Sequence, residues 1–189
     1  KKDGRIAGVL MSMNFPITIA IEFLTNPITR ECLGNNEKYF LEKALKKTTI
    51  EPYVFKNALC NPEFPEHLKT VDLLSRALRG LSFIDSLYIL ESENVPQKLK
   101  ESQEMIKFLD SIISSELWIF KYEFFSNQNV PDVSKRTLIS VIAKSNLQVH
   151  EIHSFLNDVV KKEDSLKSFF IEKLLEFKTE KSFGGIFSG

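Results

Sequence analysis

Histidines and cysteines are the side chains in this sequence with the most distinctive chemistry, and two of the histidines share one segment. His150 and His153 would lie on one face of a helix, where both imidazoles can reach a metal ion. The segment reads HEIH, whereas the zinc-protease pattern HExxH separates its ligands by four residues and places a Glu between them. No third ligand is near. The pattern therefore favours two solvent-facing imidazoles beside Ile152, and we expect no metal ion and no cofactor.

A second pair, Cys60 and His67, has the residue types of a thiolate nucleophile and its base. Catalysis would also need a neighbouring imidazole or helix N-terminus that activates the thiol, together with an oxyanion site, and closeness in sequence provides none of these. A free Cys more often acts as a small buried hydrophobic residue. The glycine-rich tail GGIFSG lacks the strand, the helix and the Lys of a phosphate-binding loop. The sequence therefore favours a non-enzymatic protein over an enzyme.

Two consecutive predicted helices, 134–144 and 147–161, resemble a DNA-binding helix-turn-helix in outline. The second helix carries Glu151 and Asp158 and no Arg or Lys before Lys161, so its carboxylates have the wrong sign for phosphate. The whole chain has 25 basic and 25 acidic side chains and a formal net charge of zero. We therefore favour two ordinary packed helices, and a nucleic-acid binder is the least favoured function.

The longest predicted element spans 97–127 and contains neither Gly nor Pro. Its apolar residues recur at steps of three and four, which predicts a helix that must be covered on more than one side. A helix of this length would measure about 45 Å, the height of a domain of this size. The residues of the apolar stripe are Ile106, Leu109, Ile113, Leu117, Phe120 and Phe124. We expect this helix to be the centre of the fold.

The composition predicts an all-α protein. The chain is 43% hydrophobic and 26% charged, which is ordinary for a folded domain, and its 16 Phe against 7 Gly suit thick layers between helices. We expect one domain over 1–181, an irregular bundle of eight or nine helices around the long helix, with a flexible aromatic and glycine tail at 182–189. No repeat at a fixed period is evident, but helices of similar length joined by short loops leave a helical solenoid as the alternative.

The remaining helices follow from caps and periodicity. Residues 17–24 alternate as in a strand but also fit a helix face, and the lack of a partner strand favours helix. The prolines at 61–65 enforce an extended connection, which is a candidate subdomain seam. Other helices are expected at 5–13, after 26, at 37–47, 51–59, 66–79, 83–90 and 165–178.

Cys32 and Cys60 are too few for a disulfide framework and have no metal-site spacing, so we expect a reducing, cytoplasmic environment. No apolar run approaches the roughly 20 residues of a membrane span, and the segment after Lys1 is too short and interrupted for a signal peptide. The first residue is Lys and not Met, which suggests a processed or excised piece of a longer chain.

These observations favour a non-enzymatic helical module that binds another protein or a peptide through an apolar groove or patch. Trp118, Tyr122 and Phe125, on the flanks of the long helix, are the expected anchors, because aromatic residues are enriched at interface hot spots. The alternative is a helical enzyme or regulator with a site assembled from distant residues. Its candidates are Cys60, His67, His150 and His153.

Overall fold

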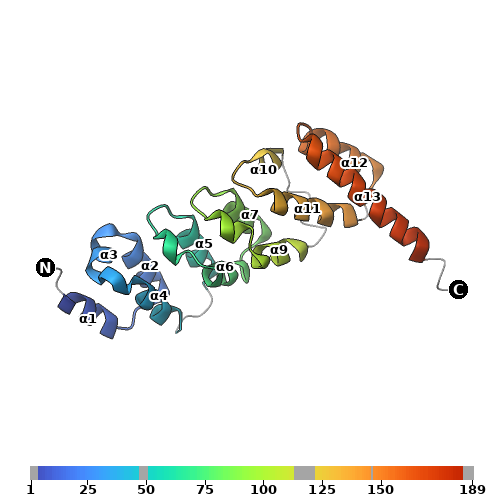
Figure 1. Ribbon diagram of the computed structural model, residues 1–189. Coiled ribbons are helices and arrows are strands. Elements are labelled where there is room, and N and C mark those ends of the chain that lie inside the picture. The colour runs from blue at the N-terminus through green and yellow to red at the C-terminus, as the bar shows by residue number, and fades with distance from the viewer. Residues whose placement is uncertain (1–3, 47–50, 113–121, 146, 185–189) are drawn as a thin grey trace. The chain divides into compact units, whose positions relative to one another are not determined.

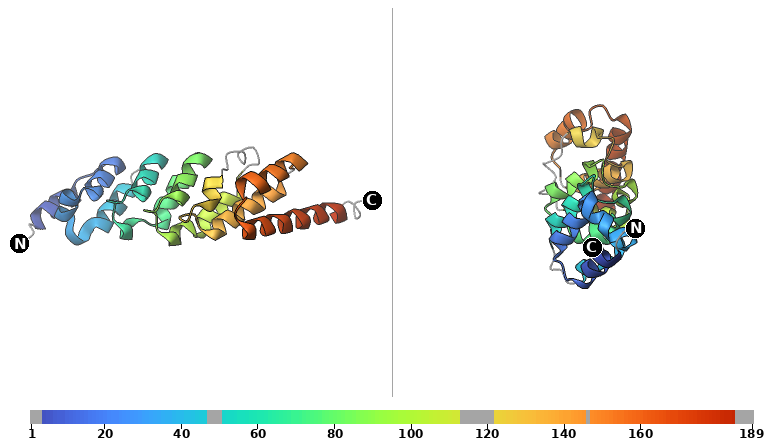
Figure 2. Two further views of the ribbon diagram at one scale, coloured as in Figure 1. Left: turned by 90° about the horizontal axis from the view of Figure 1, so that it is seen from above. Right: turned by 90° about the vertical axis from the view of Figure 1, so that its left-hand side faces the viewer.

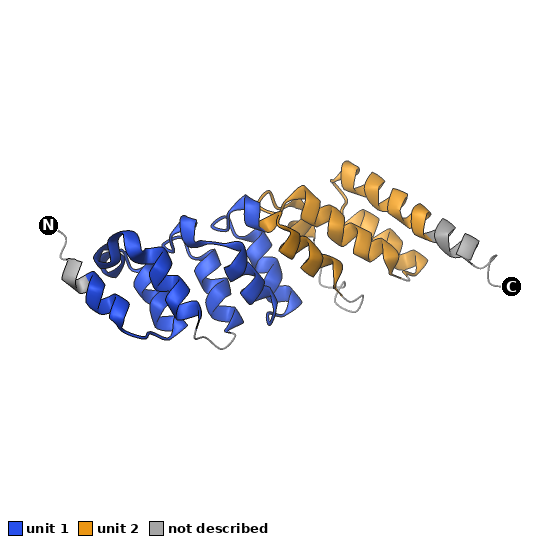
Figure 3. Ribbon diagram, turned by 60° about the horizontal axis from the view of Figure 1, so that its bottom comes forward, with its two compact units in different colours: residues 1–99 blue, residues 100–189 orange. Residues whose placement is uncertain are grey.

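The computed structural model of the protein describes residues 4–46, 51–112, 122–145 and 147–184. Over these ranges every regular element is a helix and none is a strand, which confirms the all-α class. The chain divides into two compact units, 1–99 and 100–189 (Figure 3). None of the described helices is long and apolar enough to cross a membrane.

Unit 1 is built from short helices joined by tight turns (Figure 1). Helix α5 is central to it, because it packs against α2, α6 and α7, while α2 also packs against α4. The elements are α1 (Gly4–Ser12), α2 (Ile17–Thr25), α3 (Pro27–Leu33), η1 (Gly34–Asn36), α4 (Glu37–Leu45), α5 (Pro52–Cys60), η2 (Glu66–Leu68), α6 (Val71–Leu78) and α7 (Phe83–Glu91). Helix α8 (Gln97–Lys100) lies at the boundary between the two units.

Unit 2 packs α9 (Gln103–Asp110) and α13 (Asp164–Gly184) against α11 (Asp132–Lys144). Its other elements are α10 (Tyr122–Ser126), α12 (Val149–Ser154) and the π-helical turn η4 (Phe155–Val159), which contacts α10. The left view of Figure 2 shows α13 as a long straight helix. It continues to Gly184, farther than the periodicity predicted, so the first residues of the expected tail are helical.

Residues 17–25 form a helix, as the lack of a partner strand predicted. The buried side chains of α2 are Ile17, Ala20, Ile21 and Leu24, which is the helical face and not the alternating strand face. The helix break predicted at 61–65 lies between α5 and η2 inside unit 1, but it is a turn and not an extended connection, since the N–H of Phe64 donates to the carbonyl of Asn61 at 3.3 Å.

The prediction of one continuous helix over 97–127 is wrong. Helix α8 ends at Lys100, and Ser102 has an extended backbone with φ −66 and ψ 155. Its hydroxyl accepts a hydrogen bond from the N–H of Met105, so it caps the new helix α9. A capping serine ends one helix and starts another without Gly or Pro, because its side chain competes for the backbone donors. Helix α9 ends at Asp110, and residues 113–121 lie outside the described part of the chain.

Close packing at the edge of unit 1 requires a glycine at Gly80. A Cβ atom there would lie 2.5 Å from Cγ of Pro52, the first residue of α5. Pro52 is well placed for this contact, because proline fits the first turn of a helix, where no N–H partner is available. The contact fixes the start of α5 beside the end of α6, and α5 carries the site described next.

Candidate functional site

The most conspicuous surface cluster, which we call the Lys56 cluster, comprises Tyr53 and Lys56 of α5, Ser82 at the start of α7, and Asp85 and Tyr88 of α7. Lys56 Nζ lies 2.8 Å from Asp85 Oδ1. The other carboxylate oxygen of Asp85 accepts hydrogen bonds from the hydroxyls of Tyr53 at 3.0 Å and Ser82 at 2.6 Å. The Lys56 ammonium also lies 5.5 Å from the ring centroid of Tyr53 and 5.2 Å from that of Tyr88. One ion pair therefore organises both tyrosines.

Two helices place these groups for local reasons. Ser82 caps α7, since its hydroxyl accepts a hydrogen bond from the N–H of Asp85 at 3.1 Å. Tyr53 and Lys56 lie one turn apart on α5, so both project from the same face. Because α5 packs against α7, that face meets the first turn of α7, where a carboxylate is favoured by the helix dipole.

Electrostatics in the cluster favour the charged form of Asp85. Hydrogen bonds from Lys56 and Ser82 lower the pKa of Asp85 from 3.8 to about 2. The same carboxylate raises the pKa of the Tyr53 hydroxyl above 10.0, because the neutral hydroxyl donates a hydrogen bond to it and a phenolate beside it would face a negative charge. At neutral pH Asp85 is therefore ionised and the Tyr53 phenol is neutral.

The rings themselves face solvent. Tyr53 is 52% exposed and Tyr88 is 55% exposed, and Ile84 on the same helix as Tyr88 is 47% exposed. The charges of Lys56 and Asp85 already pair with each other. The cluster can therefore contact a partner through aromatic and aliphatic surface more than through net charge. Tyrosine supplies large contact area with few rotatable bonds, which suits binding. Sequence reasoning missed this site, although the Tyr-Lys spacing on α5 was a visible signal.

The anchors predicted from sequence lie elsewhere. Trp118 is outside the described residues. Tyr122 is half-buried, and Lys161 Nζ lies 4.9 Å from its ring centroid. Phe125 is 0% exposed, because its ring packs edge-on against Phe124 and Phe155 with centroids 5.4 and 5.7 Å away. Phe125 is a core residue and not an exposed flank of a long helix.

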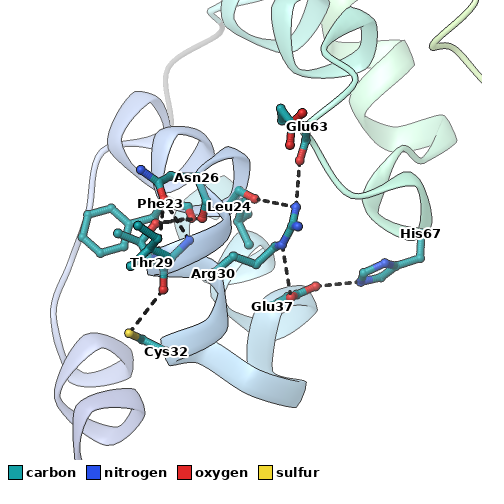
Figure 4. A network of polar contacts seen from close by, with 10 residues as sticks. Phe23, Leu24, Asn26, Thr29, Arg30, Cys32, Glu37, Glu63 and His67 are labelled. Atoms are coloured by element: carbon teal, nitrogen blue, oxygen red, sulfur yellow. Dashed lines mark hydrogen bonds and ion pairs between the residues drawn. The ribbon is translucent and has the colours of Figure 1, made fainter.

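A polar network connects α3, α4 and the turn after α5 (Figure 4). Arg30 donates from Nη1 to the carbonyl of Glu63 at 2.7 Å and to that of Leu24 at 3.3 Å, and its Nε lies 4.0 Å from Glu37. Glu37 also contacts Nε2 of His67 at 3.0 Å. The structure thus pairs His67 with a carboxylate, in an arrangement that joins chain segments.

The other titratable candidates do not form a reactive centre. Cys60 is half-buried, and its carbonyl accepts a hydrogen bond from Asn94. His153 contacts the side-chain amide of Asn157, one helical turn away. Over the described ranges no group of three or more His, Cys, Asp or Glu side chains has metal-site geometry.

The second helix of the expected helix-turn-helix is shorter than the sequence predicted. The second helix is only α12, and it opens with a capping box in which Gln148 N–H donates to Glu151 at 2.6 Å. After Ser154 the chain continues as the π-helical turn η4 and not as a regular α-helix to Lys161. A recognition helix would therefore be short and would begin with a carboxylate.

A shallow hollow of about 280 Å³ lies between α2 and α5. Its lining residues are Ile21, Glu22, Thr25, Asn26, Asn57, Ala58 and Asn61, and most of the lining surface is apolar. The amide oxygens of Asn26 and Asn61 already accept backbone N–H groups of their own turns. The hollow therefore contains no convergent reactive groups.

Over the described residues, the fold and the surface together define the class as an all-helical protein with an exposed tyrosine cluster on α5 and α7. No family model, no curated protein and no solved structure matches the chain. The function must accordingly be argued from the chain's own residues.

Proposed function

We propose that this chain is a non-enzymatic helical module that binds another protein or a peptide, and that the Lys56 cluster is its contact surface. The single observation that supports this function is the exposure of Tyr53, Tyr88 and Ile84 around a satisfied ion pair. Exposed aromatic side chains that are held in place lose little entropy when a partner covers them.

The ion pair has a positioning role in this proposal. Lys56 lies near both rings and Asp85 holds the Tyr53 hydroxyl, so the two tyrosines are preorganised before binding. Preorganised side chains bind more tightly because the cost of ordering them is already met in the free protein. Tyr53 and Tyr88 contribute the contact area, and Lys56 and Asp85 fix its shape.

The test begins with a photo-crosslinking amino acid placed at Tyr53 or Tyr88 in cells that express the protein naturally. Tyr39 of α4 is the matched control, because it is 58% exposed and lies outside the cluster. A partner captured at Tyr53 and Tyr88 but not at Tyr39 is then purified, and its affinity for the protein is measured by calorimetry.

The Tyr53→Ala/Tyr88→Ala double variant should weaken that affinity by roughly tenfold or more, as expected for interface aromatics. Tyr53→Phe should retain most of it, because the ring remains and only the hydroxyl is lost. Equal affinity of the double variant and the wild-type protein would exclude the Lys56 cluster as the contact surface.

A further inference from the structure

Four turns in the chain share one geometry. In each, the residue directly after a helix uses its side-chain oxygen to accept a hydrogen bond from the backbone N–H two residues further on. The helices are α2, α5, α7 and α10. The bonds join Asn26 to Ile28 at 2.9 Å, Asn61 to Glu63 at 2.8 Å, Ser92 to Asn94 at 3.3 Å and Asn127 to Asn129 at 2.9 Å.

The residues around these turns are also equivalent. Two positions before each turn residue lies a side chain that is 0% exposed: Leu24, Leu59, Leu90 and Phe125. The last three turns continue with a buried apolar residue and a proline: Phe64-Pro65, Val95-Pro96 and Val130-Pro131. The first turn is shorter, because Pro27 follows Asn26 at once and begins α3.

A cation that follows the preceding turn in the sequence donates a hydrogen bond to each of the last three turns. Arg30 donates to the carbonyl of Glu63 at 2.7 Å (Figure 4). Lys69 donates to the carbonyl of Asn94 at 2.7 Å, and Lys100 donates to the carbonyl of Asn129 at 2.5 Å. The accepting residue is in every case the one whose N–H is held by the turn's own Asn or Ser. Each of the three contacts lies within one of the two units.

Two of these cations are buried to an unusual degree for a basic side chain, whereas Arg30 is half-buried. Lys69 is 4% exposed and Lys100 is 2% exposed. An ammonium group removed from water is costly unless it donates hydrogen bonds, and a buried turn carbonyl is costly unless it accepts one. Lys69 also donates to Asn61 of its own turn at 2.9 Å, so it joins two successive turns. The bond satisfies both groups only when both turns are formed.

We propose that the described part of the chain contains a tandem helical repeat of four copies, in which a cation four to eight residues after the turn of one copy clasps the turn of the next copy. The copies begin with α2 and α3, with α5 and α6, with α7 and α8, and with α10 and α11. In such an array each copy contacts its neighbours, and stability is passed from copy to copy through these contacts. The clasp is the polar part of that coupling.

Native-state hydrogen exchange on Lys100→Met tests the clasp. The amides of the turn at Asn127–Val130 should exchange about tenfold to a hundredfold faster, because the carbonyl of Asn129 loses a charged donor. The turn at Asn61–Phe64 should keep its wild-type rate. Lys98→Met is the matched control, since Lys98 is exposed and lies two residues away. It should change neither turn.

The conservative variant Lys100→Arg should preserve slow exchange, because Arg30 already performs this role in the first copy. Equal acceleration of both turns in Lys100→Met, or no acceleration at Asn127–Val130, would overturn the clasp. If Lys100→Met does not fold while Lys100→Arg does, the clasp is supported, because only the donor groups separate the two variants in this respect.

The repeat itself is tested by insertion. A second copy of residues 65–95 placed directly after Val95 keeps every turn and every cation in register, since it begins at one proline and ends before the next. The longer protein should fold with a circular dichroism signal at 222 nm that increases in proportion to its length, and it should melt cooperatively. A loss of helical signal per residue, or aggregation, would overturn the repeat.

Discussion

Lys56 and Lys69 belong to the same unit but satisfy their charges in different ways. The side chain of Lys56 is 18% exposed, with a carboxylate at 2.8 Å and two exposed tyrosine rings near its ammonium group. Lys69 is 4% exposed and donates to two backbone carbonyls in successive turns. The charge of Lys56 therefore positions two exposed tyrosine side chains, whereas the charge of Lys69 holds chain segments together. Their sequence neighbourhoods gave no such distinction.

Lys69→Met should break this comparison most strongly. It should lower the free energy of unfolding by about 2 kcal/mol or more, because two interior carbonyls lose a charged donor. Urea denaturation followed by circular dichroism measures the change. Lys98→Met, at an exposed position, should change the free energy of unfolding by less than about 0.5 kcal/mol. A similar small change in Lys69→Met would contradict the role assigned to the buried lysine.

Gly80→Ala should have the next largest effect. The new Cβ would meet Pro52 at 2.5 Å and would push the first turn of α5, so the free energy of unfolding should fall by about 1–3 kcal/mol. Gly8→Ala is the matched control, because a Cβ at Gly8 meets nothing within 4 Å and alanine favours a helix. A crystal structure of Gly80→Ala with α5 undisplaced would show that the Lys56 cluster does not depend on this contact.

The pH dependence of the Lys69 contribution sharpens the contrast. Burial lowers the pKa of Lys69 below its ordinary value of 10.5, so the unfolded chain binds more protons than the folded chain just below pH 10.5. The stability of the wild-type protein relative to Lys69→Met should therefore increase as the pH rises from the lowered pKa toward 10.5. Denaturant titrations of both proteins at several alkaline pH values measure it. A constant difference would mean that the ammonium pays no desolvation cost.

The surface lysine should give the smallest effect and the opposite pH range. Lys56→Met should cost less than about 1 kcal/mol at neutral pH, as is typical of ion pairs near the surface. Asp85 has its pKa lowered to about 2, so its contribution is present above about pH 4 and is lost as the pH falls from about 4 to 2. In Lys56→Met the stability lost between about pH 4 and 2 should be smaller than in the wild-type protein.

A spectrophotometric titration of tyrosinate provides an independent check on the same cluster. In Asp85→Asn the pKa of Tyr53 should return toward 10.0, because the carboxylate that raises it is gone. An unchanged tyrosinate titration would show that the hydrogen bond between Tyr53 and Asp85 is not formed in solution.

The helical class followed from the sequence alone because the spacing of apolar residues is a local property of each segment. The same holds for Ile17 to Thr25, where the absence of a partner strand decided in favour of helix, and for the helix expected at 83–90, which is α7. The helix break at the prolines of 61–65 also depended only on neighbouring residues. Local rules were sufficient where a segment's own backbone hydrogen bonds determine its form.

The break at Ser102 and the repeat were not evident from sequence. A serine inside an apolar pattern can remain in a helix or cap a new one, and the packing of α9 against α11 favours the second state. The repeat was hidden because its prolines Pro65, Pro96 and Pro131 are unevenly spaced and its turn residue is Ser92 in one copy.

What the sequence by itself determined is the secondary structure class and most helix ends, because caps, prolines and apolar spacing act within a few residues. Only the tertiary structure decided that Phe125 is interior, that Tyr53 and Tyr88 face solvent, and that Lys69 is buried while Lys56 is not. The physical reason is that burial depends on which distant segment covers a side chain. A lysine or an aromatic ring has the same local preferences in either environment.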